Sequence, residues 1–367
     1  MNDPANGTVA GGEGTRPLKI YRVKPDPALD PTSPERASTE YHAPTLDDYE
    51  RISLAEALDI DLRFAELIMD VTFFCSFRCS YCEVANKERI GLDWEQVLVP
   101  LKAMSLTGIR AAALTGGEPG IYRHTPRILQ DLRDLHIETI VFTNGYWAKS
   151  QRRLDALTRA RPLGFLISYK AFNEADYKKL TGVALPTRVM KQALENFSGA
   201  AARGEFEEFR IDHVLTSLSA DKLSELMWLA DLPSPPKICM AMVEPHNLST
   251  IDIYPDPGVL ARSFEKLFPA LDERGITYVF ESVPLCLLGE RWRQCLDVRR
   301  VTDHRPRIYI RPHPDGDHIM IHSGYQRLIQ YGYLEECDSC AKRGQCAGIH
   351  KRAMKYYRKG GLVPFKH

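Results

Sequence analysis

Three cysteines, Cys75, Cys79 and Cys82, constrain this chain more than any other feature of its sequence. They lie in one short run, Cys-Ser-Phe-Arg-Cys-Ser-Tyr-Cys, directly after the apolar segment 67–74, which is bounded like a buried strand. Three thiolates at this spacing can hold three irons of a [4Fe–4S] cluster and leave the fourth iron open to a small chelating molecule. A zinc knuckle is the alternative that three clustered cysteines also allow.

A second motif, Gly116-Gly117-Glu118-Pro119, follows the apolar segment 111–114. Glycines permit a close backbone approach that other residues do not. Taken alone, the four residues would form an ordinary turn. After an apolar strand and a cysteine triad, they favour a binding loop.

The cysteine run, with the aromatic Tyr81 before its last cysteine, resembles the signature of the radical S-adenosylmethionine (SAM) enzymes. The Gly-Gly-Glu-Pro segment resembles the second motif of that family. This resemblance implies that the open iron binds the amino and carboxylate groups of SAM. It implies that an electron from the cluster then cleaves SAM to methionine and a 5′-deoxyadenosyl radical. The acidic residue and the carbonyls of the second motif would receive the SAM ammonium group.

Two further strand ends match segments that commonly line the SAM pocket in that family. Asn144 follows the expected strand 138–142, although a plain Asn-Gly turn is also consistent with the sequence there. Ser168 ends the expected strand 164–168, and Lys170 close by is either a further contact or a solvent-facing lysine. The cofactor-binding residues that the resemblance implies are Tyr81, Gly116, Gly117, Glu118, Pro119, Asn144 and Ser168.

Short apolar runs alternate with longer amphipathic ones from about residue 65 to 275, which favours βα units around a parallel sheet. The expected strands are 67–74, 109–114, 138–142, 164–168, 209–215 and 237–243. The expected helices are 54–58, 94–104, 126–135, 152–160, 188–202, 220–229 and 258–273. Six such units match the partial (βα)6 TIM-like barrel that the resemblance implies, in which functional residues collect at the C-terminal ends of strands.

A second set of five cysteines follows the expected barrel: Cys286, Cys295, Cys337, Cys340 and Cys346. The Cys-x2-Cys-x5-Cys spacing of the last three resembles the auxiliary-cluster domains called SPASM and its shortened form, Twitch. The resemblance implies one auxiliary [4Fe–4S] cluster and a β-hairpin, 307–311 with 318–322, between the cysteine groups. Cys286 is the expected fourth ligand because it directly follows an apolar strand, and Cys295 is the alternative. A zinc ribbon would use the same residue types.

The expected fold class is therefore α/β. It comprises a flexible N-terminal tail or strap in 1–50, the radical SAM partial barrel in 51–275, and a small C-terminal α+β auxiliary-cluster domain in 276–367.

The balance of charged residues limits the classes of binding partner that are expected. The 48 basic residues balance the 48 acidic ones, so neither nucleic acid nor an anionic membrane is expected as a partner. An arginine-rich stretch, 291–311, is expected to be a solvated face, with phosphate binding as the alternative. The sequence has no signal peptide and no apolar run of ~18 residues. Nine cysteines without a secretory signal indicate metal or redox chemistry in a cytoplasmic protein.

The expected function is hydrogen abstraction from a small-molecule biosynthetic substrate such as a sugar, nucleoside or aminocyclitol. The auxiliary cluster would transfer an electron, and a donor such as flavodoxin or ferredoxin would supply the first one. The alternative is a maturase that modifies a ribosomally made precursor peptide, with a separate leader-binding partner. A non-enzymatic iron–sulfur carrier or sensor is the third hypothesis. No catalytic acid or base stands out, although Glu244 and His246 could face the substrate.

Overall fold

One curved sheet of eleven strands organises this computed structural model, which describes residues 16–24, 46–245, 252–301, 305–322, 330–357 and 363–366. Its strand order is β2-β1-β11-β10-β3-β4-β5-β6-β7-β8-β9. The strands are β1 (Lys19–Val23), β2 (Tyr49–Ile52), β3 (Glu66–Thr72), β4 (Ala111–Gly116), β5 (Glu138–Thr143), β6 (Gly164–Ser168), β7 (Glu208–Leu215), β8 (Lys237–Met242), β9 (Tyr278–Glu281), β10 (Arg307–Arg311) and β11 (His318–His322). A separate two-stranded ladder pairs β12 (Tyr331–Gly332) with β13 (Ile349–His350).

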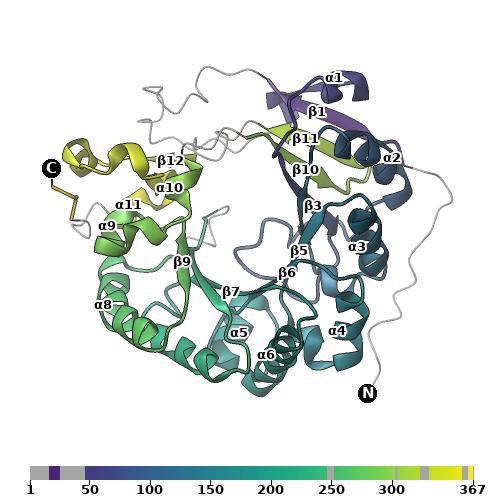
Figure 1. Ribbon diagram of the computed structural model, residues 1–367. Coiled ribbons are helices and arrows are strands. Elements are labelled where there is room, and N and C mark those ends of the chain that lie inside the picture. Colours follow the sequence, from purple (N-terminus) through teal and green to yellow (C-terminus); the bar gives the residue numbers. More distant parts are fainter. Residues whose placement is uncertain are drawn as a thin grey trace.

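Helices cover the outer face of the curved sheet, and its inner face surrounds the centre of the molecule (Figure 1). The α-helices are α1 (Leu54–Leu58), α2 (Trp94–Ser105), α3 (Thr125–Asp134), α4 (Gln151–Thr158), α5 (Glu174–Thr181), α6 (Thr187–Ala202), α8 (Pro257–Glu273), α9 (Leu285–Leu288), α10 (Asp297–Arg300) and α11 (Met354–Tyr357). The strict alternation of buried and half-buried residues in β7 follows from this arrangement. Phe209 and Ile211 pack toward the helices, while Arg210 and Asp212 lie on the inner face.

The six strands expected from the sequence are all present, each within two residues of its expected bounds, as β3 to β8. They are consecutive and parallel. The expectation of a partial TIM-like barrel is therefore confirmed. The expected helix at 220–229 is instead a 3-10 helix, η6 (Leu223–Asp231).

The sheet extends beyond the expected barrel at both ends. The hairpin expected within the C-terminal domain pairs with the barrel instead, because β10 lies parallel to β3 with Ile310 opposite Met69. At the other end, β9 continues the parallel sheet beside β8. An exposed edge of β3 would leave backbone groups unpaired, and β10 covers it with its buried Ile308 and Ile310 facing the core. One sheet therefore includes strands from both sides of residue 276.

The N-terminal region also differs from the flexible tail that the sequence suggested. Its described part contributes β1, which lies parallel to β11, with the buried Ile20 opposite Ile319. β2 pairs with β1 in the antiparallel sense and starts at Tyr49. Composition obscured these strands because each is short and pairs far away in the sequence. Residues 1–15 and 25–45 lie outside the described residues.

Helix α5 was missed by the pattern of the sequence, although its ends carry ordinary signals. The Asn173 side chain accepts a hydrogen bond from the Asp176 N–H at 2.9 Å and caps the first turn. Gly182 follows the last residue with a φ of 72°, the left-handed conformation in which helices commonly end. The helix is only eight residues long, but it lies against the predicted cluster loop.

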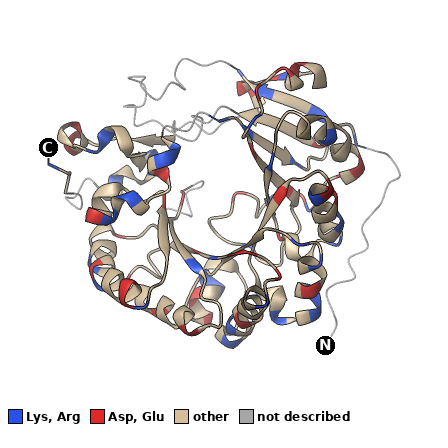
Figure 2. Ribbon diagram, in the orientation of Figure 1, with Lys and Arg blue, Asp and Glu red and all other residues tan. Residues whose placement is uncertain are grey.

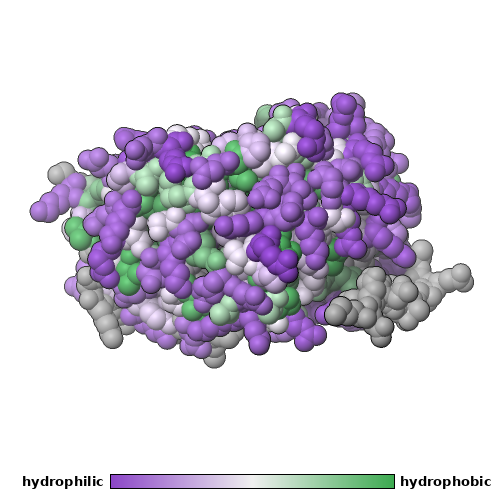
Figure 3. Space-filling view, turned by 90° about the horizontal axis from the view of Figure 1, so that it is seen from below, coloured by the Kyte–Doolittle hydropathy of each residue, from purple (hydrophilic) through white to green (hydrophobic). Residues whose placement is uncertain are grey.

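Basic and acidic residues are spread over the elements of the fold, as the blue and red segments of the ribbon show (Figure 2). In the arginine-rich stretch, Arg291 pairs with Asp272, Arg300 with Glu281 and Arg307 with Glu66. These pairs account for much of the stretch without a phosphate. The face seen in Figure 3 is largely hydrophilic, with apolar residues scattered over it. No helix in the described ranges is long and apolar enough to span a membrane.

One buried histidine gives the fold a testable pH dependence. His213 is fully enclosed, stacks on Phe172 and donates from Nδ1 to the Tyr169 carbonyl at 2.7 Å. Burial lowers the pKa of His213 to about 4, because the imidazolium loses its hydration. Between pH 6.5 and 4, His213 is therefore protonated in the unfolded chain and neutral in the folded chain. The free energy of unfolding should fall by on the order of 3 kcal/mol over that range from this residue alone.

We predict that His213→Asn, which keeps a donor for the Tyr169 carbonyl but cannot titrate, removes this dependence. At pH 7.5 the variant should be less stable than the wild type by about 1–2 kcal/mol, because it leaves a small cavity. Toward pH 5 that difference should shrink by about 2 kcal/mol. Anaerobic urea denaturation at a series of pH values measures the free energy of unfolding of both proteins. If the difference between the wild type and the variant stays constant with pH, His213 does not have a lowered pKa.

Candidate active site

The cysteine loop begins two residues after β3 and is held in place by a helix end. The N–H of Cys82 donates to the carbonyl of Cys79 at 3.0 Å, which closes a tight turn. The N–H groups of Arg78 and Ser80 donate to two carbonyls in the last turn of α5, at 2.8 and 2.9 Å. Such carbonyls have no partner within their own helix. The loop that carries Cys75, Cys79 and Cys82 is therefore fixed at the C-terminal end of the sheet.

The thiols of this loop are suited to metal ligation. Burial raises the pKa of Cys79 and raises that of Cys75 to about 11, while the nearby Lys170 ammonium opposes both shifts. The metal-free thiols thus keep their protons, and a metal that binds them must displace those protons. The Cys75 sulfur accepts contacts from the Phe77 N–H at 3.4 Å and from the Asn144 amide at 3.9 Å. These donors would stabilise a metal-bound thiolate, so the residues fit an iron–sulfur cluster.

The glycine motif lies directly against the end of β3. The N–H of Gly117 donates to the Thr72 carbonyl at 2.6 Å, and that of Glu118 donates to the Phe74 carbonyl at 2.7 Å. A Cβ atom on Gly117 would lie 2.3 Å from the Phe74 carbonyl oxygen, and one on Gly116 would lie 2.5 Å from that of Thr72. Gly116 also has a φ of 106°. Both glycines are therefore required by the close approach of two backbones.

Glu118 joins this loop to the next strand end. Its Oε1 accepts hydrogen bonds from the Gly120 N–H at 2.7 Å, the Thr143 hydroxyl at 2.5 Å and the Trp147 indole at 3.0 Å. Its Oε2 accepts from the Asn144 N–H at 2.7 Å. Burial raises the pKa of Glu118, and these four donors counteract the shift. The carboxylate is fully buried and already has four partners, so a direct contact with the SAM ammonium stays a prediction.

Lys170 is a buried residue of this site, not a solvent-facing lysine. It is 7% exposed, and its ammonium group donates to the Ser168 hydroxyl at 2.7 Å. The ammonium also lies 5.6 Å from the ring centroid of Tyr81. Desolvation lowers the pKa of Lys170, but the neighbouring Tyr81, Cys79 and Tyr177 raise it, and the net shift is upward, which keeps the lysine charged. A fixed positive charge therefore faces the cysteine loop.

The predicted cofactor-binding residues all lie near the C-terminal ends of β3 to β6. Tyr81 belongs to the cysteine loop after β3, and the Gly-Gly-Glu-Pro motif ends β4. Asn144 follows β5, and Ser168 is the last residue of β6. The structure thus brings together residues that are about 90 positions apart in the sequence. The sequence alone left open whether Lys170 contacts the cofactor, because a lysine after a strand is usually exposed.

Four of the five cysteines in the second set, Cys286, Cys337, Cys340 and Cys346, line one small pocket together with Leu285, Tyr333 and Phe365. Burial raises the pKa of Cys286 to about 12, and the three other thiols contribute to the shift. Cys295 does not line this pocket. Its thiol donates to the Val283 carbonyl at 3.7 Å and to the Asp297 carboxylate at 3.6 Å. This geometry favours Cys286 over Cys295 as the fourth member.

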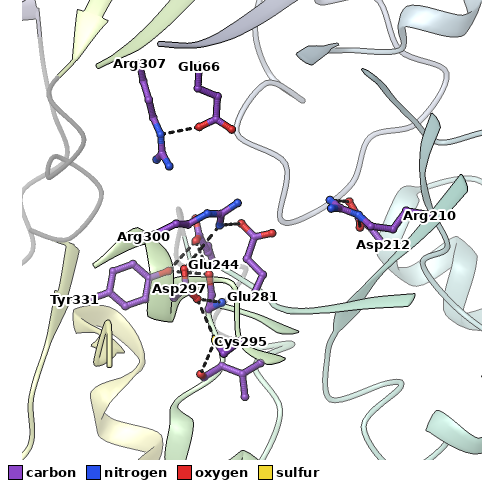
Figure 4. A network of polar contacts seen from close by, with 12 residues as sticks. Glu66, Arg210, Asp212, Glu244, Glu281, Cys295, Asp297, Arg300, Arg307 and Tyr331 are labelled. Atoms are coloured by element: carbon purple, nitrogen blue, oxygen red, sulfur yellow. Dashed lines mark hydrogen bonds and ion pairs between the residues drawn. The ribbon is translucent and has the colours of Figure 1, made fainter. Parts of the chain in front are cut away.

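Charged side chains from β7, β9 and α10 lie on the inner side of the curved sheet (Figure 4). Arg210 of β7 binds Asp212 on the same strand at 2.8 Å. Arg300 of α10 binds Glu281 at the end of β9 at 2.5 Å. Burial raises the pKa of Asp212, against the effect of Arg210.

A neighbouring polar group in the same view centres on Glu244. It accepts hydrogen bonds from the Tyr331 hydroxyl at 2.7 Å and from the Ser282 hydroxyl at 3.0 Å. The sequence singled out only Glu244 in this region as facing a substrate. His246, its predicted companion, lies outside the described residues. The sequence analysis did not identify Arg210 and Asp212 of β7 as candidate site residues. Their alternation with apolar residues along the strand was the signal that could have indicated it.

The close approach of the glycine loop predicts a sharp effect of a single methyl group. Gly117→Ala should destabilise the fold by about 1–3 kcal/mol, because the new Cβ would overlap a backbone carbonyl that cannot rotate away. Gly344→Ala is the matched control, since nothing lies within 4 Å of the position its Cβ would occupy. Chemical denaturation of both variants measures the difference. Equal stability of the two would show that the loop can relax without cost.

Comparisons with known proteins agree with this site. Residues 69–203 match the family model of the radical SAM superfamily. A probable GTP 3',8-cyclase of Saccharolobus solfataricus is 31% identical over 132 residues, which cover 34% of this chain and 41% of that protein. The GTP 3',8-cyclase of Tolumonas auensis is 28% identical over 181 residues, 47% of this chain and 51% of that protein. The chain therefore spans about half, or less, of the length of these curated relatives.

A solved structure shows the same fold over most of the chain. The crystal structure of Streptococcus suis SuiB bound to S-adenosylmethionine has a TM-score of 0.55 at 17% identity. The match covers 85% of this chain and 78% of that one. The family model spans β4, β5 and β6 together with both predicted binding motifs. On this evidence residues 69–203 of the chain form a radical SAM domain.

Proposed function

We propose that this chain reductively cleaves SAM and uses the resulting radical to abstract hydrogen from a small-molecule biosynthetic substrate. A [4Fe–4S] cluster held by Cys75, Cys79 and Cys82 would supply the electron that cleaves SAM to methionine and a 5′-deoxyadenosyl radical. The observation that carries the proposal is the pairing of the cysteine loop with the glycine loop. Gly116 and Gly117, which have no room for a Cβ atom, allow the glycine loop to lie against the end of β3, directly before the cysteine loop.

Individual residues have separate roles in this proposal. Asn144 orients the Cys75 ligand through its amide. Lys170 places a buried cation beside the cysteine loop, where a cluster and the carboxylate of SAM would both bring negative charge. Ser168, which accepts from Lys170, is positioned for a polar contact with SAM. Glu118 acts as a positioning residue, because its four hydrogen bonds, two from backbone N–H groups and two from side chains, join the loops after β4 and β5.

A second [4Fe–4S] cluster on Cys286, Cys337, Cys340 and Cys346 is part of the proposal. Four cysteines would fill every iron of such a cluster, so it would carry electrons and leave no iron for a substrate. This role favours oxidation of a product radical over redox-neutral isomerisation. The common pocket of the four thiols supports this set, and so does the separate environment of Cys295.

The charged inner wall supports a small polar substrate. Arg210 with Asp212, and Arg300 with Glu281, offer donors and acceptors on the inner side of the curved sheet. The curated relatives are named for action on GTP, itself a small polar molecule. A precursor-peptide substrate is the second candidate, because SuiB was also crystallised with its precursor peptide SuiA. A pure electron carrier would have no need of the glycine loop.

The two-cluster proposal predicts how iron content responds to cysteine substitution. Replacing Cys75, Cys79 and Cys82 together by Ala should leave about four irons per chain after anaerobic reconstitution. Adding Cys286→Ala should abolish that remainder, whereas adding Cys295→Ala, the matched control, should preserve it. Iron and sulfide analysis with Mössbauer spectroscopy measures the outcome. No residual iron in the triple variant would remove the auxiliary cluster, and zinc in its place would identify a zinc site.

Substrate class is tested by 5′-deoxyadenosine formation. The reconstituted protein, SAM and a flavodoxin or ferredoxin reducing system are incubated with host extract, with and without prior protease treatment of the extract. Stimulation that survives the protease is expected, because the proposed substrate is a small metabolite. Stimulation abolished by the protease would favour the precursor peptide. The Cys75→Ala variant is the blank for SAM cleavage, and failure of the wild type to form 5′-deoxyadenosine would contradict the enzyme assignment.

A further inference from the structure

Three potential metal ligands, none of them a cysteine, meet in the turn between β10 and β11. They are His313, Asp315 and His318, and their ligand atoms all lie within 4.8 Å of one another. His318 is buried, whereas His313 and Asp315 are partly exposed. The two imidazole rings stack, with centroids 4.3 Å apart and planes 16° apart.

The turn has a defined shape because it packs against the start of the described chain. Gly316 has a φ of 122°, and a Cβ there would lie 1.8 Å from the Pro17 carbonyl oxygen. The N–H of Lys19 donates to the Asp317 carbonyl at 2.9 Å. The Arg16 guanidinium donates to the His313 carbonyl at 3.1 Å. The three potential ligands are therefore carried by a constrained turn that a neighbouring strand supports.

One carboxylate oxygen faces both imidazoles. Asp315 Oδ1 contacts His313 Nδ1 and lies 3.3 Å from His318 Nε2. An imidazole nitrogen carries a lone pair when the proton is on the other ring nitrogen, so each of the three atoms can be a metal ligand. A cation beside all three atoms would take the place of the protons that the imidazoles otherwise donate to the carboxylate.

Lys19 arranges the carboxylate for such a role. Its ammonium group contacts Asp315 Oδ2 and leaves Oδ1 directed at the two imidazoles. Groups that hydrogen-bond the outer oxygen of a ligating carboxylate are a regular part of metal sites, because they fix its orientation. The two histidines and one carboxylate are nitrogen and oxygen donors that suit Zn²⁺ and neighbouring divalent transition metals. The partial exposure of His313 and Asp315 leaves room for water at the remaining positions.

We propose that His313, Asp315 and His318 bind a divalent transition metal ion of the Zn²⁺ type, independently of the iron–sulfur sites. Such an ion would tie the β10–β11 turn together beside β1. Two contacts join the same turn region to the rest of the sheet. Asp317 accepts a hydrogen bond from the Asp93 N–H at 2.6 Å, and Arg311 binds Asp70 at 2.9 Å. Bound metal should therefore stabilise the fold at this end.

The experiment uses the tag-free, full-length protein with its iron–sulfur sites reconstituted, so that the cysteines are occupied. Equilibrium dialysis against Zn²⁺ should give about one zinc per chain, and the Tm should rise by a few degrees. His313→Gln and Asp315→Asn, both at partly exposed positions, should each weaken binding at least tenfold and lose the rise in Tm. His136→Asn, which removes an exposed histidine outside the turn, is the matched control and should bind like the wild type.

Zinc K-edge X-ray absorption separates this site from the cysteines. The proposal requires nitrogen and oxygen neighbours at about 2.0–2.1 Å with imidazole scattering and without sulfur at about 2.3 Å. Sulfur in the first shell would overturn it, because the zinc would then lie on thiolates. Absence of bound zinc in the wild type, or equal binding by His313→Gln and the wild type, would also overturn it. None of these measurements depends on SAM cleavage, so failure here is distinguishable from failure of the proposed function.

Discussion

The close contact between the end of β3 and the loop after β4 is the constraint on which the rest of the site depends. The pairing of these strands shifts register between Asp70 and Thr72, and the glycine loop then takes over the Thr72 and Phe74 carbonyls. Because the N–H groups of Gly117 and Glu118 donate to these carbonyls, the chain can leave the sheet and form the cysteine loop without unpaired backbone carbonyls. Glu118 extends the same arrangement to β5, because its carboxylate accepts hydrogen bonds from the Thr143 hydroxyl, the Asn144 N–H and the Trp147 indole. The cysteine loop is thus positioned by backbone contacts from the glycine loop and from the last turn of α5.

Much of the barrel could be predicted from the sequence, because local patterns determine it. Parallel strands buried on both faces read as short apolar runs, and each helix between them has its own periodicity. The motif residues were found because they follow those strands. Pairing between distant segments carries no such local signal. Nothing near Lys19 or Ile308 in the sequence indicates that β1 and β10 belong to the main sheet, so their pairing within it was not predicted. The burial of Lys170 was hidden for the same reason, since it depends on Tyr81 and Ser168.

The interior of the barrel tolerates charge because most of its ions have partners close by. An isolated carboxylate on the inner wall would be costly, and Asp212 with its raised pKa shows that cost even beside Arg210. Pairing on the same strand, as in Arg210 with Asp212, keeps the wall polar without demanding a ligand. Each charged side chain of the inner wall can therefore exchange its ion-pair partner for a polar group of a bound molecule. An apolar wall would offer no such exchange.

The position of β1 beside β11 has a consequence for how the chain is made. Arg16 and His313, which hydrogen-bond in the finished fold, are 297 positions apart in the sequence. β10, which covers the edge of β3, is likewise synthesised long after the cysteine loop has left the ribosome. Because contacts between distant segments form late, the nascent barrel has an open seam at β3 until nearly the whole chain has emerged. The edge of β3 therefore stays uncovered until residues 307–311 have been synthesised, long after Cys75, Cys79 and Cys82.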